Sequence, residues 1–590
     1  DVSSAASDVY KRQGRFDHEF QRVVIGRRNQ HRLEIRLACG SITDVDARAY
    51  VLGMFRDVTP AGAARAIDSL LAGTISEFIT RRMFNGNVGE ISIIPTGRHA
   101  VRSDLIAFAG LGAFDKFNRD VLEIVAENII RTFLKTKVDD FATVLFGGSS
   151  GQEPTAVLEN LLTGFFRGLR DADTDHRFHG VTICETDRKR YDAIKRELYR
   201  LSSTPLFDQI EVTIDEIHLP PMVEKRVWGA RLVERRDPIY LIVRCSKSED
   251  DILEFESSVL TSGAKATVVS AKKEVTQSLL QQHLERISAT GFTFAKLADF
   301  GQKLTGLVLA ADIVALLTRF PENQLVVVHD ALASLIPWET INFGDSFPAA
   351  TGGLSRRYLA DNLSVAKWLE QRKYGPQLDV LLVVNPTGDL PGAAAEGQRI
   401  QELFGDYTSA IKLKVLEESQ ARRKVLLELF SSGRYDVVHY AGHAYFDPHS
   451  PARSGILCSG REVLSGADLA GIGNLPALMF FNACEAARVR KPQGPTDPEL
   501  AMPKRIQRSV GLAEAFLRGG VANYMGTYWP VGDASAKRFA EVFYGGLLQG
   551  NSIGQALLEA RKEIQDHSWV DWADYVLYGS PEFVLKIPSI

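Results

Sequence analysis

The chain is poor in cysteine, and the arrangement of its few cysteines excludes two classes of protein. Among 590 residues there are five cysteines, at Cys39, Cys184, Cys245, Cys458 and Cys484. Their number is odd, they are scattered, and no two form a CxxC pair. A disulfide framework and a zinc knuckle are therefore excluded as the basis of the fold. We expect the protein to work in a reducing cytoplasm.

Strong charge and long apolar runs are also lacking. The formal net charge of −4 offers no global attraction to nucleic acid or anionic lipid, and no DNA-binding signature is present. The most apolar helix candidate, residues 304–318, is too short to span a bilayer comfortably and carries Asp312. The polar N-terminus shows no secretory signal, and we predict residues 1–30 to be a tail. We expect no membrane partner.

Two regions alternate strand-like and helix-like patterns, which is typical of α/β domains. A chain of 590 residues is too long for one hydrophobic core. We therefore predict a first α/β domain at 31–217, a connector at 218–237 and a second α/β domain at 238–590. The Pro220-Pro221 pair and the dense charge of the connector favour a boundary there.

The predicted strands are short apolar or alternating segments that stand between helix-like stretches. In the first region they are 32–40, 50–55, 90–95, 105–112, 141–147 and 179–185. In the second region they are 238–245, 324–330, 379–386, 436–443, 477–484 and 521–529. Several of the second set are continuous apolar runs, which indicates a mostly parallel sheet covered on both faces. The clearest helical spacing lies at 61–81, 120–136, 304–318 and 552–565.

Two of these apolar strands end in residues that can do chemistry together. Segment 436–443 ends in His443, and segment 477–484 ends in Cys484. In an open parallel sheet, active sites lie outside the carboxyl ends of the strands, so neighbouring strands would bring imidazole and thiol together. The imidazole would activate the thiol, and the backbone N–H groups of Cys484 and Ala444 would form an oxyanion hole. The alternative is a buried cysteine that only fills space, next to a histidine that is merely hydrogen-bonded.

The same region resembles the CHAT family of caspase-like cysteine peptidases. The resemblance covers 297–585 and is carried by VVHYAGHA, LMFFNACEAA and TYWPVGD, with QLVVVHDALASLIPWETI and LPGAAAEGQRIQELF upstream. It implies a caspase-like α/β fold and an endopeptidase whose dyad is His443 and Cys484. It implies no metal and no cofactor. It also implies a protein substrate, encoded nearby in some cases, and a role in bacterial regulated proteolysis, antiviral defence or cell death.

The resemblance also suggests residues that contact the substrate. Asn482 takes the place of the Gln that precedes the nucleophile in caspases. Asp533 corresponds to an acidic pocket position for arginine in separases, or it caps the helix that begins there. Glu485 adds negative charge to the site or belongs to a solvated loop. The proline-rich basic segment 488–508 is expected to be a loop that gates the site or is cut by the enzyme itself.

The first region resembles the macro-like N-terminal domain of leucyl aminopeptidases. The resemblance spans 32–201 and is carried by YVLGMF, GAARAIDSLLAGTISEFITRRMFNGNVGEISIIPT and SDLIAFAGLG. The residues after this domain do not resemble the metal-binding catalytic domain of those peptidases, so only a macro-like three-layer α/β fold is carried over.

Macro-like folds often bind nucleotide-derived ligands, and GGSSG at 147–151 is either a phosphate cradle or a plain turn. The first domain would then regulate the second, sense a ligand or dock the substrate. A CHAT scaffold without proteolysis and a nucleotide-binding regulator are the alternatives. The oligomeric state is left open.

Overall fold

The structure is a computed structural model of the chain. It describes residues 23–25, 31–71, 73–80, 82–96, 101–136, 138–147, 152–174, 176–207, 210–219, 238–248, 251–261, 268–286, 293–344, 346–359, 377–407, 409–445, 453–469, 476–482, 513, 517, 521, 523–527, 531–567 and 570–585.

The chain divides into two compact units. Unit 1 comprises 1–56, 60–73 and 86–231, and unit 2 comprises 57–59, 74–85 and 232–590. Of the predicted connector 218–237, only 218 and 219 are among the described residues. Of the predicted tail 1–30, only Val23–Ile25 is described, and these apolar residues form a short strand.

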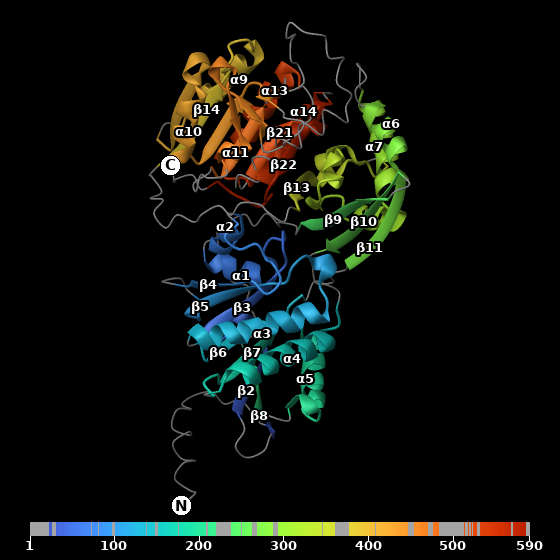
Figure 1. Ribbon diagram of the computed structural model, residues 1–590, viewed down its shortest axis with the longest axis vertical. Coiled ribbons are helices and arrows are strands. Elements are labelled where there is room, and N and C mark those ends of the chain that lie inside the picture. Colours follow the sequence, from blue (N-terminus) through green and yellow to red (C-terminus); the bar gives the residue numbers. More distant parts are fainter. Residues whose placement is uncertain are drawn as a thin grey trace, which may run out of the picture. The chain divides into compact units, whose positions relative to one another are not determined.

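Unit 1 is built on an 8-stranded sheet in the order β1-β8-β2-β7-β6-β3-β5-β4. The inner strands run parallel, and the edge strands β1 and β4 run antiparallel to their neighbours. Helices α3, α4 and α5 pack side by side along this sheet (Figure 1). The strands are β1 (Val23–Ile25), β2 (His31–Cys39), β3 (Ala49–Met54), β4 (Ile91–Pro95), β5 (Leu105–Gly110), β6 (Asp140–Val144), β7 (Gly180–Glu185) and β8 (Ile210–His218). The helices are α1 (Ala63–Leu70), α3 (Arg119–Thr136), α4 (Pro154–Ala172) and α5 (Arg188–Leu201).

All six strands predicted for the first region are present, together with β1 and β8. The single helix predicted at 61–81 is wrong, because the chain forms α1 and then α2 (Thr74–Thr80), which belongs to unit 2. The break falls at Gly73, whose φ of 81° is left-handed and cannot continue a helix.

Unit 2 is built on an 11-stranded sheet in the order β11-β10-β9-β12-β13-β22-β21-β20-β16-β14-β15. Most neighbours in it are parallel, as predicted, and the antiparallel pairs are β9–β10, β10–β11 and β21–β22. A separate 3-stranded sheet has the order β17-β18-β19. The strands are β9 (Ile239–Lys247), β10 (Ile252–Thr261), β11 (Val268–Thr276), β12 (Leu325–His329), β13 (Leu354–Tyr358), β14 (Leu378–Val384), β15 (Ile411–Glu417), β16 (Val437–Ala441), β17 (Ala444–Tyr445), β18 (Gly455–Leu457), β19 (Val463–Ser465), β20 (Leu478–Asn482), β21 (Asn523–Thr527) and β22 (Tyr575–Tyr578).

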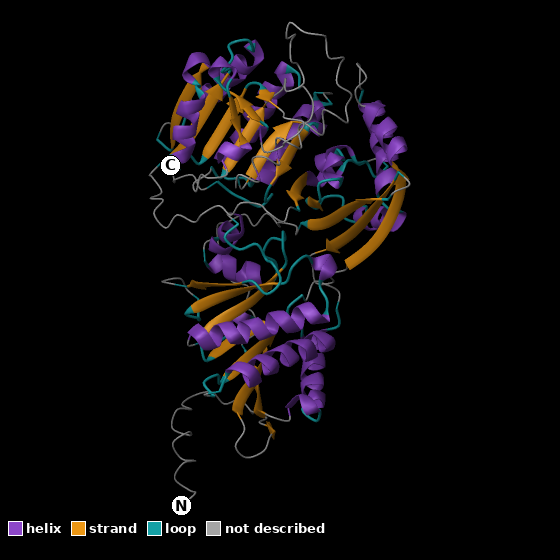
Figure 2. Ribbon diagram, in the orientation of Figure 1, coloured by secondary structure: helices purple, strands orange, loops and turns teal. Residues whose placement is uncertain are grey.

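Helices alternate with the strands of unit 2, as Figure 2 shows. They are α2 (Thr74–Thr80), α6 (Gln277–Glu285), α7 (Phe294–Val308), α8 (Ala311–Leu317), α9 (Pro391–Gly405), α10 (Arg423–Ser431), α11 (Gly466–Leu469), α13 (Asp533–Leu548) and α14 (Ile553–Asp566). The single helix predicted at 304–318 is wrong, since extended residues Leu309 and Ala310 separate α7 from α8. Within the described part of the chain, no helix has the length and apolar character needed to cross a membrane.

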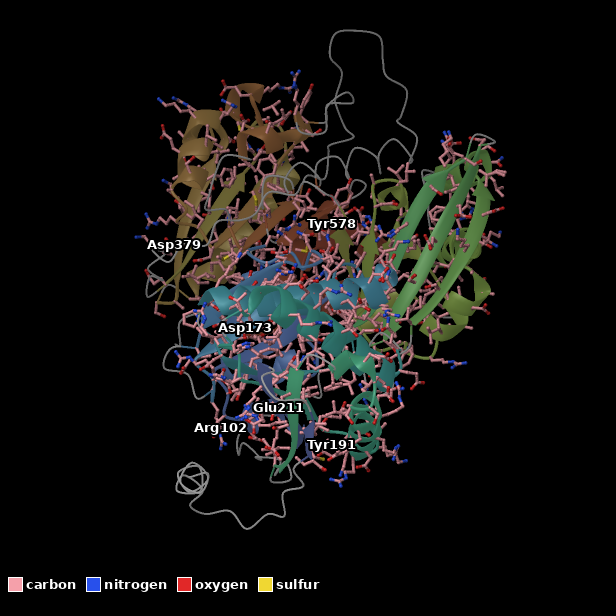
Figure 3. All side chains as sticks on the ribbon, turned by 60° about the horizontal axis from the view of Figure 1, so that its bottom comes forward. Arg102, Asp173, Tyr191, Glu211, Asp379 and Tyr578 are labelled. Atoms are coloured by element: carbon pink, nitrogen blue, oxygen red, sulfur yellow. The ribbon has the colours of Figure 1, made fainter. Side chains whose placement is uncertain are left out.

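Two arginines and one carboxylate are fully buried in the centre of unit 2. Arg356 on β13 donates to Glu339 through Nε at 2.9 Å and through a second contact from Nη2, and its guanidinium lies 6.0 Å from the ring centroid of Tyr578 (labelled in Figure 3). Arg561 on α14 donates to the carbonyls of Leu354 at 3.0 Å and Tyr575 at 2.6 Å. Burial lowers the pKa of Arg561 to about 10, although Glu339 opposes the shift. The cluster joins β13 and α14.

We predict that Glu339→Ala destabilises unit 2 by about 3–5 kcal/mol, because it leaves two buried guanidinium groups without a carboxylate. The measurement is urea unfolding followed by tryptophan fluorescence, since Trp338 and Trp572 are buried in this unit. The exposed Glu428→Ala is the matched control, with an expected change within about 0.5 kcal/mol. Equal unfolding midpoints for the two variants would contradict the assignment.

Candidate functional site

Strands β16 and β20 are neighbours and run parallel, as predicted from their sequences. Their register pairs Val437 with Leu478 at one end and Ala441 with Asn482 at the other. All ten of the paired residues are buried. In the sequence, His443 and Cys484 each come two residues after the last pair.

Several predicted site residues lie outside the described part of the chain. Cys484, Glu485 and the segment 488–508 are among them, as is 148–151 of the glycine-rich segment. His443, Ala444 and Asn482 are described. For Asp533, the backbone is described as the first residue of α13.

The amino ends of β14 and β16 are tied together by side chains. Asp379 at the start of β14, labelled in Figure 3, gives its backbone N–H to the Asp436 carboxylate at 3.0 Å. Its own carboxylate accepts from Arg434 Nε at 2.9 Å. These contacts fix β16 at the end away from His443, so the strand enters the site in a defined register.

The turn after β16 is held by Tyr440. Its buried hydroxyl lies 2.5 Å from the His443 carbonyl and 2.8 Å from the Leu457 carbonyl, both of which can accept its hydrogen. Gly442 lies against this hydroxyl, and a Cβ at that position would come within 2.6 Å of it. The glycine is therefore required by close approach, and the turn places His443 just beyond the strand.

The imidazole of His443 is bound to a carboxylate from another loop. Nε2 of His443 lies 3.0 Å from Oδ1 of Asp389, which comes after β14 and shortly before α9. Thr387 donates to the same oxygen, and Arg461 Nη2 approaches the other oxygen at 3.4 Å. Burial opposes the charge of Asp389, but the hydrogen bond from Thr387 and the presence of His443 hold its pKa below the usual value. The Asp389 carboxylate is thus in contact with three possible hydrogen-bond donors, which are Thr387, His443 and Arg461.

The backbone of Ala444 is oriented by the small sheet. Leu457 donates its N–H to the His443 carbonyl at 2.9 Å, and the next pair along is Ala444 with Ile456. Because hydrogen-bonded and non-hydrogen-bonded pairs alternate in an antiparallel ladder, the N–H of Ala444 points away from β18. This orientation is compatible with the predicted use of that N–H as an oxyanion donor.

Asn482 has different contacts from those predicted. Its buried side chain donates through Nδ2 to both oxygens of Glu396 on α9, at 2.9 Å each. Glu396 Oε1 also lies 3.1 Å from His439 Nε2, an ion-pair distance but off the line of a hydrogen bond. His439 Nδ1 lies 2.9 Å from the Tyr544 hydroxyl. The amide is therefore engaged in a buried polar chain, which does not fit a side chain that faces substrate.

The start of α13 is capped by a residue other than Asp533. Gly532 occupies the N-cap position, and Asp571 accepts from the Gly532 N–H at 3.1 Å and from the Ser535 hydroxyl. The alternative in which Asp533 is the N-cap is therefore wrong, because Asp533 is the first helical residue.

Sequence reasoning missed Asp389, Glu396 and Arg461. The first two belong to one segment, with Asp389 before α9 and Glu396 in its second turn. A usable signal was present, since Asp389-Leu390-Pro391 comes after the carboxyl end of an apolar strand and opens a helix with proline in its first turn.

Comparison with known families confirms both resemblances. Residues 298–580 match the family described as "CHAT domain", and residues 51–170 match "Cytosol aminopeptidase family, N-terminal domain". Residues 298–580 thus form a CHAT domain, and it is preceded by a domain of the cytosol aminopeptidase N-terminal type. The CHAT match includes His443, Cys484, Asp389 and Glu396.

A curated relative is similar to the first domain. A "Probable cytosol aminopeptidase" of Sulfurihydrogenibium sp. (strain YO3AOP1) is 32% identical over 110 residues, which cover 18% of this chain and 21% of the relative. The chain therefore spans about a fifth of the length of this relative.

Solved macrodomains are also similar to part of the chain. One from Trypanosoma brucei in complex with ADP-ribose has 18% identity and a TM-score of 0.24, covering 28% of this chain and 68% of that one. One from Oceanobacillus iheyensis with MES bound has 13% identity and a TM-score of 0.25, covering 31% and 98%. The macrodomain of Mycobacterium tuberculosis DarG has 14% identity and a TM-score of 0.22, covering 26% and 98%.

We predict that Glu396→Ala lowers the free energy of unfolding by about 1–3 kcal/mol, because it strips buried donors on Asn482 of their acceptor. Urea unfolding measures the change. Glu402→Ala on the same helix is the control, since the Glu402 side chain is 52% exposed and should cost less than about 0.5 kcal/mol. A Glu396 variant as stable as this control would show that the buried chain of polar groups contributes nothing.

Proposed function

We propose that the chain is a cysteine endopeptidase in which Cys484 is the nucleophile and His443 is the proton acceptor and donor. The observation that carries the proposal is the parallel register of β16 and β20, which ends at Ala441 and Asn482. Neighbouring strands lie about 4.8 Å apart, so two residues more on each strand would bring imidazole and thiol within reach of each other. The CHAT match supports the same pair.

In the proposed reaction, His443 accepts the proton of the Cys484 thiol and the thiolate attacks the carbonyl carbon of the peptide bond. The resulting oxyanion is stabilised by the backbone N–H groups of Ala444 and Cys484. The imidazolium of His443 then gives its proton to the leaving amine as the C–N bond breaks, which leaves a thioester. A water molecule gives a proton to His443 and attacks the thioester, and the C–S bond breaks to release the acid. No cofactor enters these steps.

The residues that were predicted to contact the substrate have different roles in the proposed site. Asn482 positions the end of β20 through Glu396 rather than binding substrate. Asp533 binds a basic side chain next to the cut, and Glu485 adds negative charge there. The segment 488–508 gates access to the thiol or is cut by the enzyme itself.

Unit 1 regulates the peptidase, senses a nucleotide-type ligand or docks the protein substrate. The family match at 51–170 supports a macro-like domain for this role. A setting in bacterial regulated proteolysis or antiviral defence, in the cytoplasm, is inferred from the CHAT resemblance and the scattered cysteines.

The intact chain is expected to create new N-termini in a cell lysate or in the products of neighbouring genes, and Cys484→Ala and His443→Ala are expected to create none of them. The measurement is N-terminal peptide mapping by mass spectrometry, with and without candidate nucleotides. Identical cuts from all three proteins would contradict the proposal. An absence of cuts under every condition would favour the scaffold alternative.

Replacing Asp533 by Asn is expected to lower cleavage after Arg or Lys on the order of tenfold, because one charge-assisted hydrogen bond is lost. Glu485→Gln, assayed in parallel, shows which of the two acids sets the preference. Rates are measured on peptides that differ only in the residue before the cut. An unchanged preference in the Asp533 variant would remove this residue from the pocket.

A further inference from the structure

We propose that Asp389 is a positioning residue for His443, which selects the imidazole tautomer whose Nδ1 is free to accept the thiol proton. This inference rests on the proposed function and adds a third residue to its dyad. It starts from the 3.0 Å contact between His443 Nε2 and Asp389 Oδ1. The imidazole is mostly buried, with 12% of the side chain exposed, and the Asp389 side chain is 43% exposed.

A carboxylate can only accept hydrogen bonds, so the nitrogen that faces it must carry the proton. In neutral His443, Nε2 is then the donor and Nδ1 holds the free electron pair that accepts the thiol proton. After that transfer the imidazolium lies beside a negative charge, which favours the ion pair of thiolate and imidazolium. Asp389 thus acts on the thiol through His443 and touches no reacting atom.

The surroundings of Asp389 hold the carboxylate in place. Thr387 binds the same oxygen as His443, and Arg461 approaches the second oxygen at 3.4 Å. Arg461 has a backbone φ of 61°, a left-handed conformation that is uncommon for a residue with a Cβ.

A second contact from the same segment of the chain supports the site. Asp389 precedes α9, and Glu396 of that helix binds Asn482 at the end of β20. One short stretch of chain therefore holds both His443, just beyond β16, and the last residue of β20. A shift of α9 would therefore move His443 and Asn482 together.

The test is the rate at which iodoacetamide alkylates Cys484 in the full-length chain, followed by mass spectrometry from pH 5 to pH 9. It needs neither substrate nor trigger. Burial raises the pKa of the Cys184, Cys245 and Cys458 thiols to about 12, so these slow residues are internal references. Among the residues that the structure describes, His443 and Arg461 are the charged groups in contact with Asp389, and Glu418 lies beside the neighbouring Gly388.

Asp389→Asn is expected to move the pH profile of alkylation upward by about one unit and to lower the rate at pH 7 about tenfold. Asp389→Glu should recover part of the rate, and Thr387→Val should give a smaller shift in the same direction. Asp406→Asn, an exposed carboxyl at the far end of α9, is the matched control and should leave the profile unchanged.

The His443→Ala variant distinguishes a failure of the role of Asp389 from a failure of the dyad of His443 and Cys484. If it slows alkylation of Cys484 but Asp389→Asn leaves the pH profile in place, the role of Asp389 is overturned and the dyad stands. If His443→Ala has no effect, the dyad and with it the proposed peptidase are overturned. A faster reaction in Asp389→Asn would show a restraint on His443 and would also overturn the positioning role. A lower melting temperature with an unshifted profile would reduce Asp389 to a structural residue.

Discussion

Backbone hydrogen bonds between β16 and β20 place Val437 beside Leu478 and Ala441 beside Asn482. A slip of one residue would turn every side chain of a strand to the other face of the sheet. Both strands are buried throughout, so such a slip would also disrupt the core. The pairing of Ala441 with Asn482 is thus set by the hydrophobic core.

Helix α9 and the loop before it link the ends of these strands. Asp389 reaches His443, and Glu396 reaches Asn482 and lies beside His439. At the other end, the Asp436 carboxylate receives the N–H of Asp379. Side-chain contacts therefore hold the ends of β16 and the carboxyl end of β20. Backbone hydrogen bonds hold the paired residues between these ends. Sites whose supporting residues are held in this way keep their geometry more closely than sites built on free loops.

The sequence predicts the central strands well because continuous apolar runs leave few alternatives. Strands β12, β14, β16 and β20 are of this kind, and all of them lie where the runs indicated. The hairpin of β10 and β11 was missed. Strand β11 carries charge on an exposed edge, so it lacks an apolar run. The break between α7 and α8 was also missed, because Leu309 and Ala310 carry no turn signal of their own.

In the candidate site, too, some residues could be predicted from the sequence and others could not. His443 and Cys484 could be singled out because each ends an apolar run of the sequence. Asp389 also follows an apolar run and comes just before a helix that opens with proline, but its pairing with His443 could not be predicted, because it depends on the turn at Arg461 and on the end of β16, both distant in sequence. Asn482 was assigned to the pocket by resemblance to caspases, but the buried Glu396 engages its amide. The role of a side chain such as Asn482 depends on contacts between segments that are distant in sequence. The contact of Asn482 with Glu396 on α9 therefore cannot be predicted from a local sequence pattern.

In the proposed dyad, the register of β16 and β20 brings position 443 next to Cys484. The most direct measurement is cross-linking of a His443→Cys variant by mild oxidation, with the product mapped by non-reducing peptide mass spectrometry. A disulfide requires Cα atoms about 4.4–6.8 Å apart. We predict a bridge between positions 443 and 484 that disappears when Cys484 is also replaced by Ala. If the folded variant keeps both thiols free under oxidation that couples other close cysteine pairs, the two positions do not meet and the proposed dyad is wrong.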